Sequence, residues 1–165
     1  MRRKHYVGFL FIFMSACIWA QNTADQYLKN YEARIKLERI DDVYIPKDLK
    51  DALKELDRLT DTKTALELIS SSEDTIASKL HFNLGRWMQI HWGLEEGSRL
   101  SFYLKNRGLS FPDDMMDLLI RCWYRHLKQL PLDDQQLIDH YINQRQKEFQ
   151  LRKANEPKPR IIKKS

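Results

Sequence analysis

Residues 73–92 read EDTIASKLHFNLGRWMQIHW, and this stretch decides the predicted fold. An α-helix turns by about 100° per residue, so side chains three, four and seven positions apart share a face. Two adjacent faces collect most of the apolar and aromatic side chains, namely Leu80, Leu84, Trp87 and His91 on one and His81, Gly85, Met88 and Trp92 on the other. So broad an apolar surface predicts that the helix over 73–91 is the central, most buried helix.

Polar residues and glycines mark the ends of this predicted helix. Ser71 or Ser72 precedes it, and either hydroxyl would accept a hydrogen bond from a backbone N–H of the first turn. Gly93 suits the left-handed conformation that closes many helices. Gly85 costs about 1 kcal/mol relative to alanine inside a helix. We therefore expect another helix to approach closely at Gly85.

Further helices are predicted on both sides of this stretch. Helical spacing of apolar residues recurs over 23–40, from Pro46 to 59, around 65–69, over 98–107, over 112–130 and from 133 onward, where Phe149 lies on the apolar side. We find no alternating strand pattern of useful length, and the five glycines and five prolines mostly separate the periodic segments. The sequence predicts an all-α fold, a compact single-domain bundle of about five to seven helices.

The segment over 112–130 has two apolar stripes and a polar side. Pro112 suits a first helical turn, and Asp113 and Asp114 follow where the helix dipole favours anions. Cys122 falls within an apolar stripe, which favours a small buried side chain over a nucleophile. The positions left for the solvent side are Asp117, Arg121, Tyr124 and Lys128.

The N-terminal segment has the pattern of an export signal. Three basic residues at 2–4 precede an apolar run over 7–13, and small residues lead to Ala20. This predicts cleavage near Ala20 and a periplasmic or secreted protein. As an alternative, residues 14–17, MSAC, resemble a bacterial lipobox, in which Cys17 would carry a lipid anchor.

Charge separates the body of the chain from its C-terminal end. Residues 145–165 hold eight basic and two acidic residues, whereas residues 21–144 carry a net charge of −4. The acidic body argues against nucleic acid as a partner, and the basic tail offers peripheral contact with a membrane surface. The predicted organisation is a signal peptide at 1–20, an N-terminal helix and connector at 21–44, a helical domain at 45–152 and a basic disordered tail at 153–165.

Several spaced blocks carry a resemblance to a known family. They read IPKDL at 45–49, LHFNLGRW at 80–87, WGL at 92–94, GSRL at 97–100, FPDDM at 111–115 and YRHL at 124–127. Together they resemble a small bacterial domain family of unknown function from Bacteroidetes-type bacteria. Its members pair an HFxLGxW…WGLxxGSRL block with a PDDM…YxRxL block. The chain departs from that pattern at residues 89–91 and at Glu95. The resemblance implies an exported or short stand-alone protein, supports the domain boundary and assigns no chemistry.

Conspicuous polar and aromatic residues of these blocks form the candidate ligand- or partner-binding set, His81, Trp87, Trp92, Arg99, Asp113, Asp114 and Arg125. One interpretation is structural, with Asp113 and Asp114 capping a helix and Arg99 or Arg125 pairing with them across a helix junction. The other is a pocket in which Arg99 and Arg125 bind an anion or a peptide terminus, because guanidinium groups bind carboxylates through two hydrogen bonds.

No recognisable catalytic or metal motif accompanies these residues. The chain lacks HExxH and CxxC, and His81 and His91 would lie about 80° apart around a helix. Ser98 is better explained as a helix N-cap than as a nucleophile. We therefore predict no metal, no cofactor and no catalytic residue. The predicted function is a non-catalytic interaction module of the bacterial envelope, with an envelope protein or peptide as its partner. The alternative is a small envelope hydrolase centred on His81, Arg99 and Asp113.

Overall fold

The computed structural model describes residues 25–155. The predicted signal peptide, Cys17 and residues 156–165 of the basic tail lie outside the described residues. After a short N-terminal helix, the described helices are α2 (Leu49–Leu59), α3 (Thr62–Leu68), α4 (Glu73–Leu80), α5 (Arg86–His91), α6 (Arg99–Asn106), α7 (Pro112–Leu127) and α8 (Asp134–Asn155), with the π-helical turn η1 (His81–Gly85) joining α4 to α5. The predicted all-α fold is confirmed.

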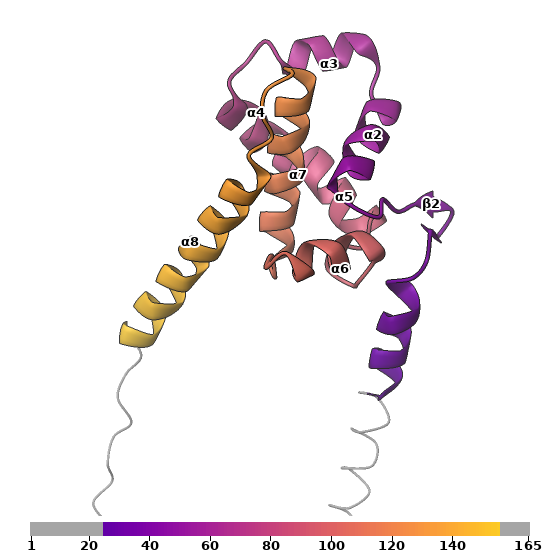
Figure 1. The fold of residues 1–165 in the computed structure, drawn as a ribbon, viewed down its shortest axis with the longest axis vertical. Helices are drawn as coiled ribbons and strands as arrows, with labels where there is room; N and C mark the ends of the chain where they lie inside the picture. The colour runs from indigo at the N-terminus through magenta and orange to yellow at the C-terminus, as the bar shows by residue number, and fades with distance from the viewer. Residues whose placement is uncertain (1–24, 156–165) are drawn as a thin grey trace, which may run out of the picture.

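Helix α7 lies at the centre of this arrangement (Figure 1). Helices α2, α4, α5 and α8 and the turn η1 all pack against it. Nine of its 16 residues are buried, including Leu118, Leu119 and Cys122. The prediction that the helix over 73–91 is the central and most buried one is therefore wrong.

The stretch 73–91 is not one regular helix. The turn η1 widens the helix locally, and such a turn shifts the residues that follow it around the axis relative to those before it. One of the two predicted apolar faces packs: Gly85, Met88 and Trp92 are buried, whereas His91 on the other face is exposed. Phe82 and Ile90, which lie on neither face, are 81% and 58% exposed. Gly85 faces α7, because a Cβ atom there would lie 3.4 Å from the Met116 sulfur. The expected close approach of another helix at Gly85 is confirmed.

Side-chain caps define where several helices begin. The side chains of Asp48, Asp61, Ser72 and Ser98 accept backbone hydrogen bonds at the starts of α2, α3, α4 and α6. Of the two predicted caps before α4, Ser72 is the one used. Helix α2 begins three residues later than Pro46, since Asp48 supplies the capping carboxylate. Pro112 starts α7 as predicted.

The N-terminal region contains a short helix followed by a hairpin. Residues 25–34 are helical, and β1 (Arg39–Ile40) then pairs with β2 (Val43–Tyr44) in antiparallel fashion. The predicted helix over 23–40 is thus too long. Asp41 and Asp42 turn the chain with φ angles of 47° and 61°, a conformation that Asp tolerates and that a two-residue hairpin turn requires. Strands of two residues are too short to give an alternation signal.

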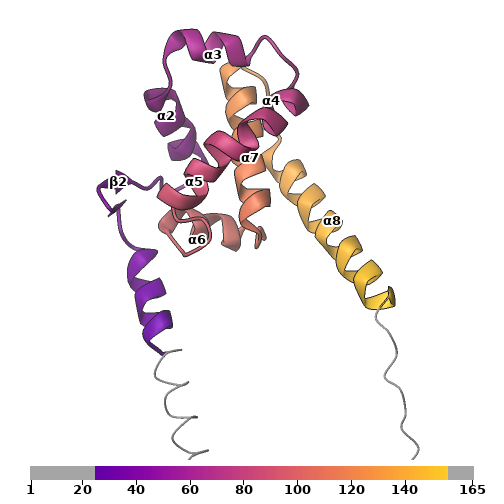
Figure 2. The ribbon, with the colours of Figure 1, turned by 180° about the vertical axis from the view of Figure 1, so that it is seen from behind.

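Helix α8 runs back along α7 and then extends away from the body (Figures 1 and 2). Its first half packs on α7 through Ile138 and Tyr141, which are buried. Residues 153–155, assigned to the tail from sequence, form the end of this helix. Within residues 25–155, no helix has the length and apolar character needed to cross a membrane.

Candidate functional site

The C-terminal half of α7 is joined to its neighbours by charged side chains. Arg125 donates to both carboxylate oxygens of Glu73, with Nε–Oε2 and Nη2–Oε1 distances of 2.8 and 2.9 Å, and to the Leu132 carbonyl at 2.8 Å. Arg121 donates to Glu73 at 3.2 Å and to Asp117 at 2.7 Å. Glu73 therefore holds two guanidinium groups, and Arg125 links α7 to the start of α4.

The predicted solvent side of α7 is therefore wrong for three of its four positions. Asp117 and Arg121 are half-buried and Tyr124 is buried, while Lys128 is exposed. Tyr124 donates to the Ser71 carbonyl at 2.8 Å, and Tyr141 of α8 donates to Asp117. Burial and the hydrogen bond to Asp117 raise the pKa of Tyr141 above its usual value. The start of α4 and the first half of α8 cover the side that helical periodicity left for water.

Arg99 lies apart from this network, beside the N-terminal hairpin. Its Nε donates to the Ile45 carbonyl at 2.6 Å, and its guanidinium carbon lies 5.1 Å from the centroid of the Tyr44 ring. Its Nη2 lies 4.0 Å from Glu38. The predicted pairing of Arg99 or Arg125 with Asp113 or Asp114 is wrong, because the two arginines bind the hairpin region and α4 instead.

The two aspartates at the start of α7 have different surroundings. Asp113 is exposed, whereas Asp114 is only 8% exposed. Asp114 accepts two hydrogen bonds from Arg145 of α8, with Oδ1–Nη2 and Oδ2–Nε distances of 2.6 and 2.9 Å. This hydrogen bond raises the pKa of Arg145 above its usual value, the opposing effect of burial being smaller. The sequence gives no signal for Arg145 as a site residue, because no local pattern relates it to Asp114, 31 positions away.

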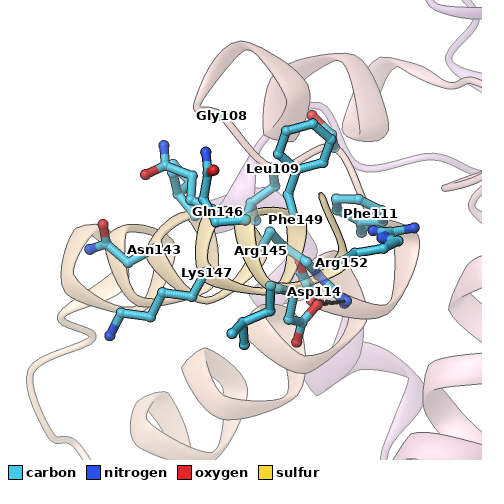
Figure 3. Close-up of a pocket in the computed structure, with 15 residues that line it drawn as sticks. Gly108, Leu109, Phe111, Asp114, Asn143, Arg145, Gln146, Lys147, Phe149 and Arg152 are labelled. Carbon is cyan, nitrogen blue, oxygen red and sulfur yellow. Dashed lines mark hydrogen bonds and ion pairs between the residues drawn. The ribbon is translucent and has the colours of Figure 1, made fainter. Parts of the chain in front are cut away.

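A groove of about 940 Å³ opens beside the Asp114–Arg145 ion pair (Figure 3). One wall is the loop over 108–111 and the other is the second half of α8. Phe111 and Phe149 line it and are 47% and 56% exposed. The guanidinium carbon of Arg145 lies 4.4 Å from the centroid of the Phe111 ring. The ion pair thus also positions one of the two aromatic side chains.

The wall formed by the loop is held against α8 by close packing. Gly108 has a φ of 100°, and a Cβ atom there would lie 2.7 Å from Cδ1 of Ile142. Leu109 is buried beneath the groove at 1% exposure. Glycine therefore permits both the backbone conformation and the close approach that bring this loop onto α8.

Charged side chains surround the groove unevenly. Its two carboxylates, Asp114 and Glu148, are both paired with Arg145. Lys147 and Arg152 also line it and are exposed. Across residues 25–155, neither of these two cations forms an ion pair. The open edge of the groove therefore offers positive charge, while its negative charge is already neutralised.

The predicted aromatic residues lie on a different part of the molecule. His81 is half-buried with its ring edge-on to Phe82, and Trp87 is half-buried and stacked on His91 at 4.9 Å. Trp92 is fully buried. Of the seven predicted site residues, only Asp114 lines the groove. Phe111 and Phe149, which do line it, carried no signal that separates them from core aromatics.

The residues of the alternative hydrolase site are not joined to one another. In the part of the chain that the structure describes, no hydrogen bond or ion pair links His81, Arg99 and Asp113. Ser98 forms a capping box with Ser101 at the start of α6, as its predicted N-cap role requires. Cys122 is buried, and burial raises the pKa of its thiol to about 12, which confirms a packing role.

The fold is that of an all-α domain, and its last helix, α8, forms one wall of an open groove lined by aromatic side chains. A family model described as "domain of unknown function (DUF6794)" matches residues 45–127. The match covers half of the chain, so the chain belongs to this family, and the predicted membership of a domain family of unknown function is confirmed. No curated protein and no solved structure matches the chain. Helices α2–α7 lie inside the match and α8 lies outside it.

Proposed function

We propose that this chain is an exported, non-catalytic interaction module of the bacterial cell envelope, and that it binds a protein or peptide in the groove beside α8. The observation that carries the proposal is the exposure of Phe111 and Phe149 in one concave surface. Clustered exposed aromatic side chains in a groove are typical of binding sites, since they supply large contact area at low entropic cost.

The remaining charged residues of α7 support this choice of surface. Arg121 and Arg125 have their hydrogen-bonding groups directed to Glu73, Asp117 and the Leu132 carbonyl, so they have a structural role. Asp114 and Arg145 differ because their ion pair borders open space rather than another packed helix. The groove is therefore the better candidate for binding.

Site-specific crosslinking tests the proposed function. A photoreactive amino acid replaces Phe149 in the full-length protein, expressed in its native envelope, and a matched variant carries it at Phe82, which is 81% exposed on η1. We expect a defined crosslinked adduct from position 149 that position 82 does not give. The same adducts from both positions, or none from position 149, would contradict the proposal.

Export is supported by the basic residues at 2–4, the apolar run that follows and Ala20. The mass of the protein isolated from its own cells distinguishes the two routes. Cleavage after Ala20 leaves a chain that begins at Gln21, in the periplasm or secreted. A lipid-anchored protein would instead begin at Cys17 and carry the added acyl mass. An intact N-terminus at Met1 would contradict export by either route.

A further inference from the structure

We infer that the ligand of this groove is an acidic peptide segment. It inserts a large apolar side chain between Phe111 and Phe149 and places carboxylates against Lys147 and Arg152. This inference rests on the proposed function and names the chemistry of the partner. Three features of the groove carry it: its preformed apolar walls, its size and the sign of its unpaired charge.

The apolar walls are fixed before any ligand binds. Arg145 holds Phe111 through its stacked guanidinium, and Asp114 holds Arg145 through two hydrogen bonds. Gly108 keeps the loop in contact with Ile142 of α8. A preformed site loses little conformational entropy on binding, so more of the contact energy contributes to affinity.

The second half of α8 leaves its apolar side chains uncovered. From Gln146 onward, no side chain of α8 in the described part forms a hydrogen bond with another element. Phe149 is 56% exposed there and Leu151 is 65% exposed. Because a short solvated helix is marginally stable by itself, a ligand that covers Phe149 would also stabilise this part of α8.

The length and openness of the groove favour a peptide segment over a small metabolite or a broad protein surface. Its volume of about 940 Å³ lies near the upper end for pockets that enclose small molecules, about 300–1,000 Å³. The groove also runs along several turns of α8, from Ile142 to Arg152. An elongated open groove of this size accommodates a few consecutive side chains of an extended or helical segment.

The charge at the edge selects an acidic segment. Residues 145–155 contain four basic residues and one acidic residue, and that acid, Glu148, is paired with Arg145. Of the carboxylates that the structure places on the groove, Asp114 and Glu148, neither is left to accept the charge of a basic peptide that approaches Lys147 and Arg152. Exposed ion pairs add little affinity each. They add mainly to specificity and association rate, so the apolar anchor supplies most of the binding energy.

Selection from a displayed library of short random peptides tests the inference with the full-length protein as bait. We expect enriched sequences to combine an aromatic or large aliphatic residue with neighbouring Asp or Glu. For a synthetic copy of one such peptide, Phe149→Ala should weaken binding roughly tenfold or more. Arg152→Glu should weaken it roughly threefold to tenfold. The matched controls, Phe82→Ala and Lys79→Glu, change an exposed aromatic and an exposed lysine elsewhere and should leave binding unchanged.

Other outcomes overturn the inference in distinguishable ways. Enriched neutral or basic peptides that still require Phe149 would overturn the acidic ligand and leave the interaction module standing. Peptides whose binding ignores Phe149 would overturn the groove as their site. Self-association of the protein that Phe149→Ala abolishes would identify a second copy as the occupant. The crosslinking experiment judges the proposed function separately, because it depends on the native partner and on no chosen peptide.

Discussion

The two ends of α7 use the same kinds of charged side chain for different purposes. At the C-terminal end, Arg121 and Arg125 converge on Glu73, and packed helices cover the network. At the N-terminal end, Asp114 and Arg145 pair beside an open groove lined by Phe111. The difference lies in what surrounds the ion pair rather than in its chemistry. A covered network fixes helix positions, whereas an ion pair at an open edge positions a binding surface.

The largest effect is expected at the covered end. Replacing Glu73 with alanine leaves the half-buried guanidinium groups of Arg121 and Arg125 without their shared carboxylate. We expect a loss of about 2–4 kcal/mol in the free energy of unfolding, measured by urea denaturation. The control is Glu67→Ala, which removes an exposed carboxylate 4.0 Å from Lys63 and should cost less than about 0.5 kcal/mol. Equal losses for the two variants would contradict a structural role for Glu73.

A smaller effect is expected where the loop meets α8. Gly108→Ala places a Cβ atom against Ile142 and forces alanine to a φ of 100°. We expect about 1–3 kcal/mol of destabilisation, together with weaker peptide binding, since the loop must move away from α8. Thermal unfolding and peptide affinity are measured alongside Ser78→Ala, which changes an exposed serine of α4 outside the groove. Unchanged peptide binding in Gly108→Ala would show that the groove does not depend on the contact between Gly108 and Ile142.

Arg145→Ala tests the open end directly. The substitution leaves Asp114 without its partner, and loss of the Arg145 side chain opens the buried carboxylate to water in the adjoining groove. We therefore expect a loss of about 1–2 kcal/mol in the free energy of unfolding, less than for Glu73→Ala. Peptide binding should fall at the same time because Phe111 loses its stacked neighbour. A loss of stability as large as that of Glu73→Ala would erase the proposed difference between the two ends.

Several of these features could be predicted from the sequence, and others could not. Helix starts at Ser72, Ser98 and Pro112 follow from local capping and backbone chemistry, which a single segment contains. One of the two faces predicted for 73–92 is buried, at Gly85, Met88 and Trp92, whereas the other is half-buried at Leu84 and exposed at His91. Periodicity gives the direction of the apolar faces but does not say how many of them the neighbouring helices cover.

The partners of the charged residues were also beyond the sequence. Periodicity places Arg125 on a face of α7 but does not say that Glu73 lies opposite it. The candidate site was the least predictable part of the molecule. Asp114 could be identified from the sequence, whereas Arg145 and Phe149 lie in a helix outside the family match.

The smallest effect is expected at the hairpin, where Asp51 accepts hydrogen bonds from Tyr44 and from the Lys47 backbone. Burial raises the pKa of Asp51, but these hydrogen bonds and the charge of Arg99 outweigh it and lower the pKa. The ionised form is thus favoured in the folded state. Its contribution is present above the unfolded pKa and is lost as the pH falls through the lower folded value.

Asp51→Asn should therefore cost about 0.5–1 kcal/mol at neutral pH. Its unfolding free energy should converge with that of the unsubstituted protein as the pH falls below about 4. Urea unfolding at a series of pH values measures this difference. A difference that grows toward acid pH would contradict the favoured ionised form.

Amide hydrogen exchange with and without a selected acidic peptide tests the difference between the two ends of α7 most directly. We predict slower exchange on binding in the loop over 108–111 and along residues 145–152, which together form the groove. Residues 71–74 and 121–128 should exchange at unchanged rates, because the network around Glu73 is complete without a ligand. Protection centred on the start of α4 and the C-terminal end of α7, with none along α8, would contradict the account.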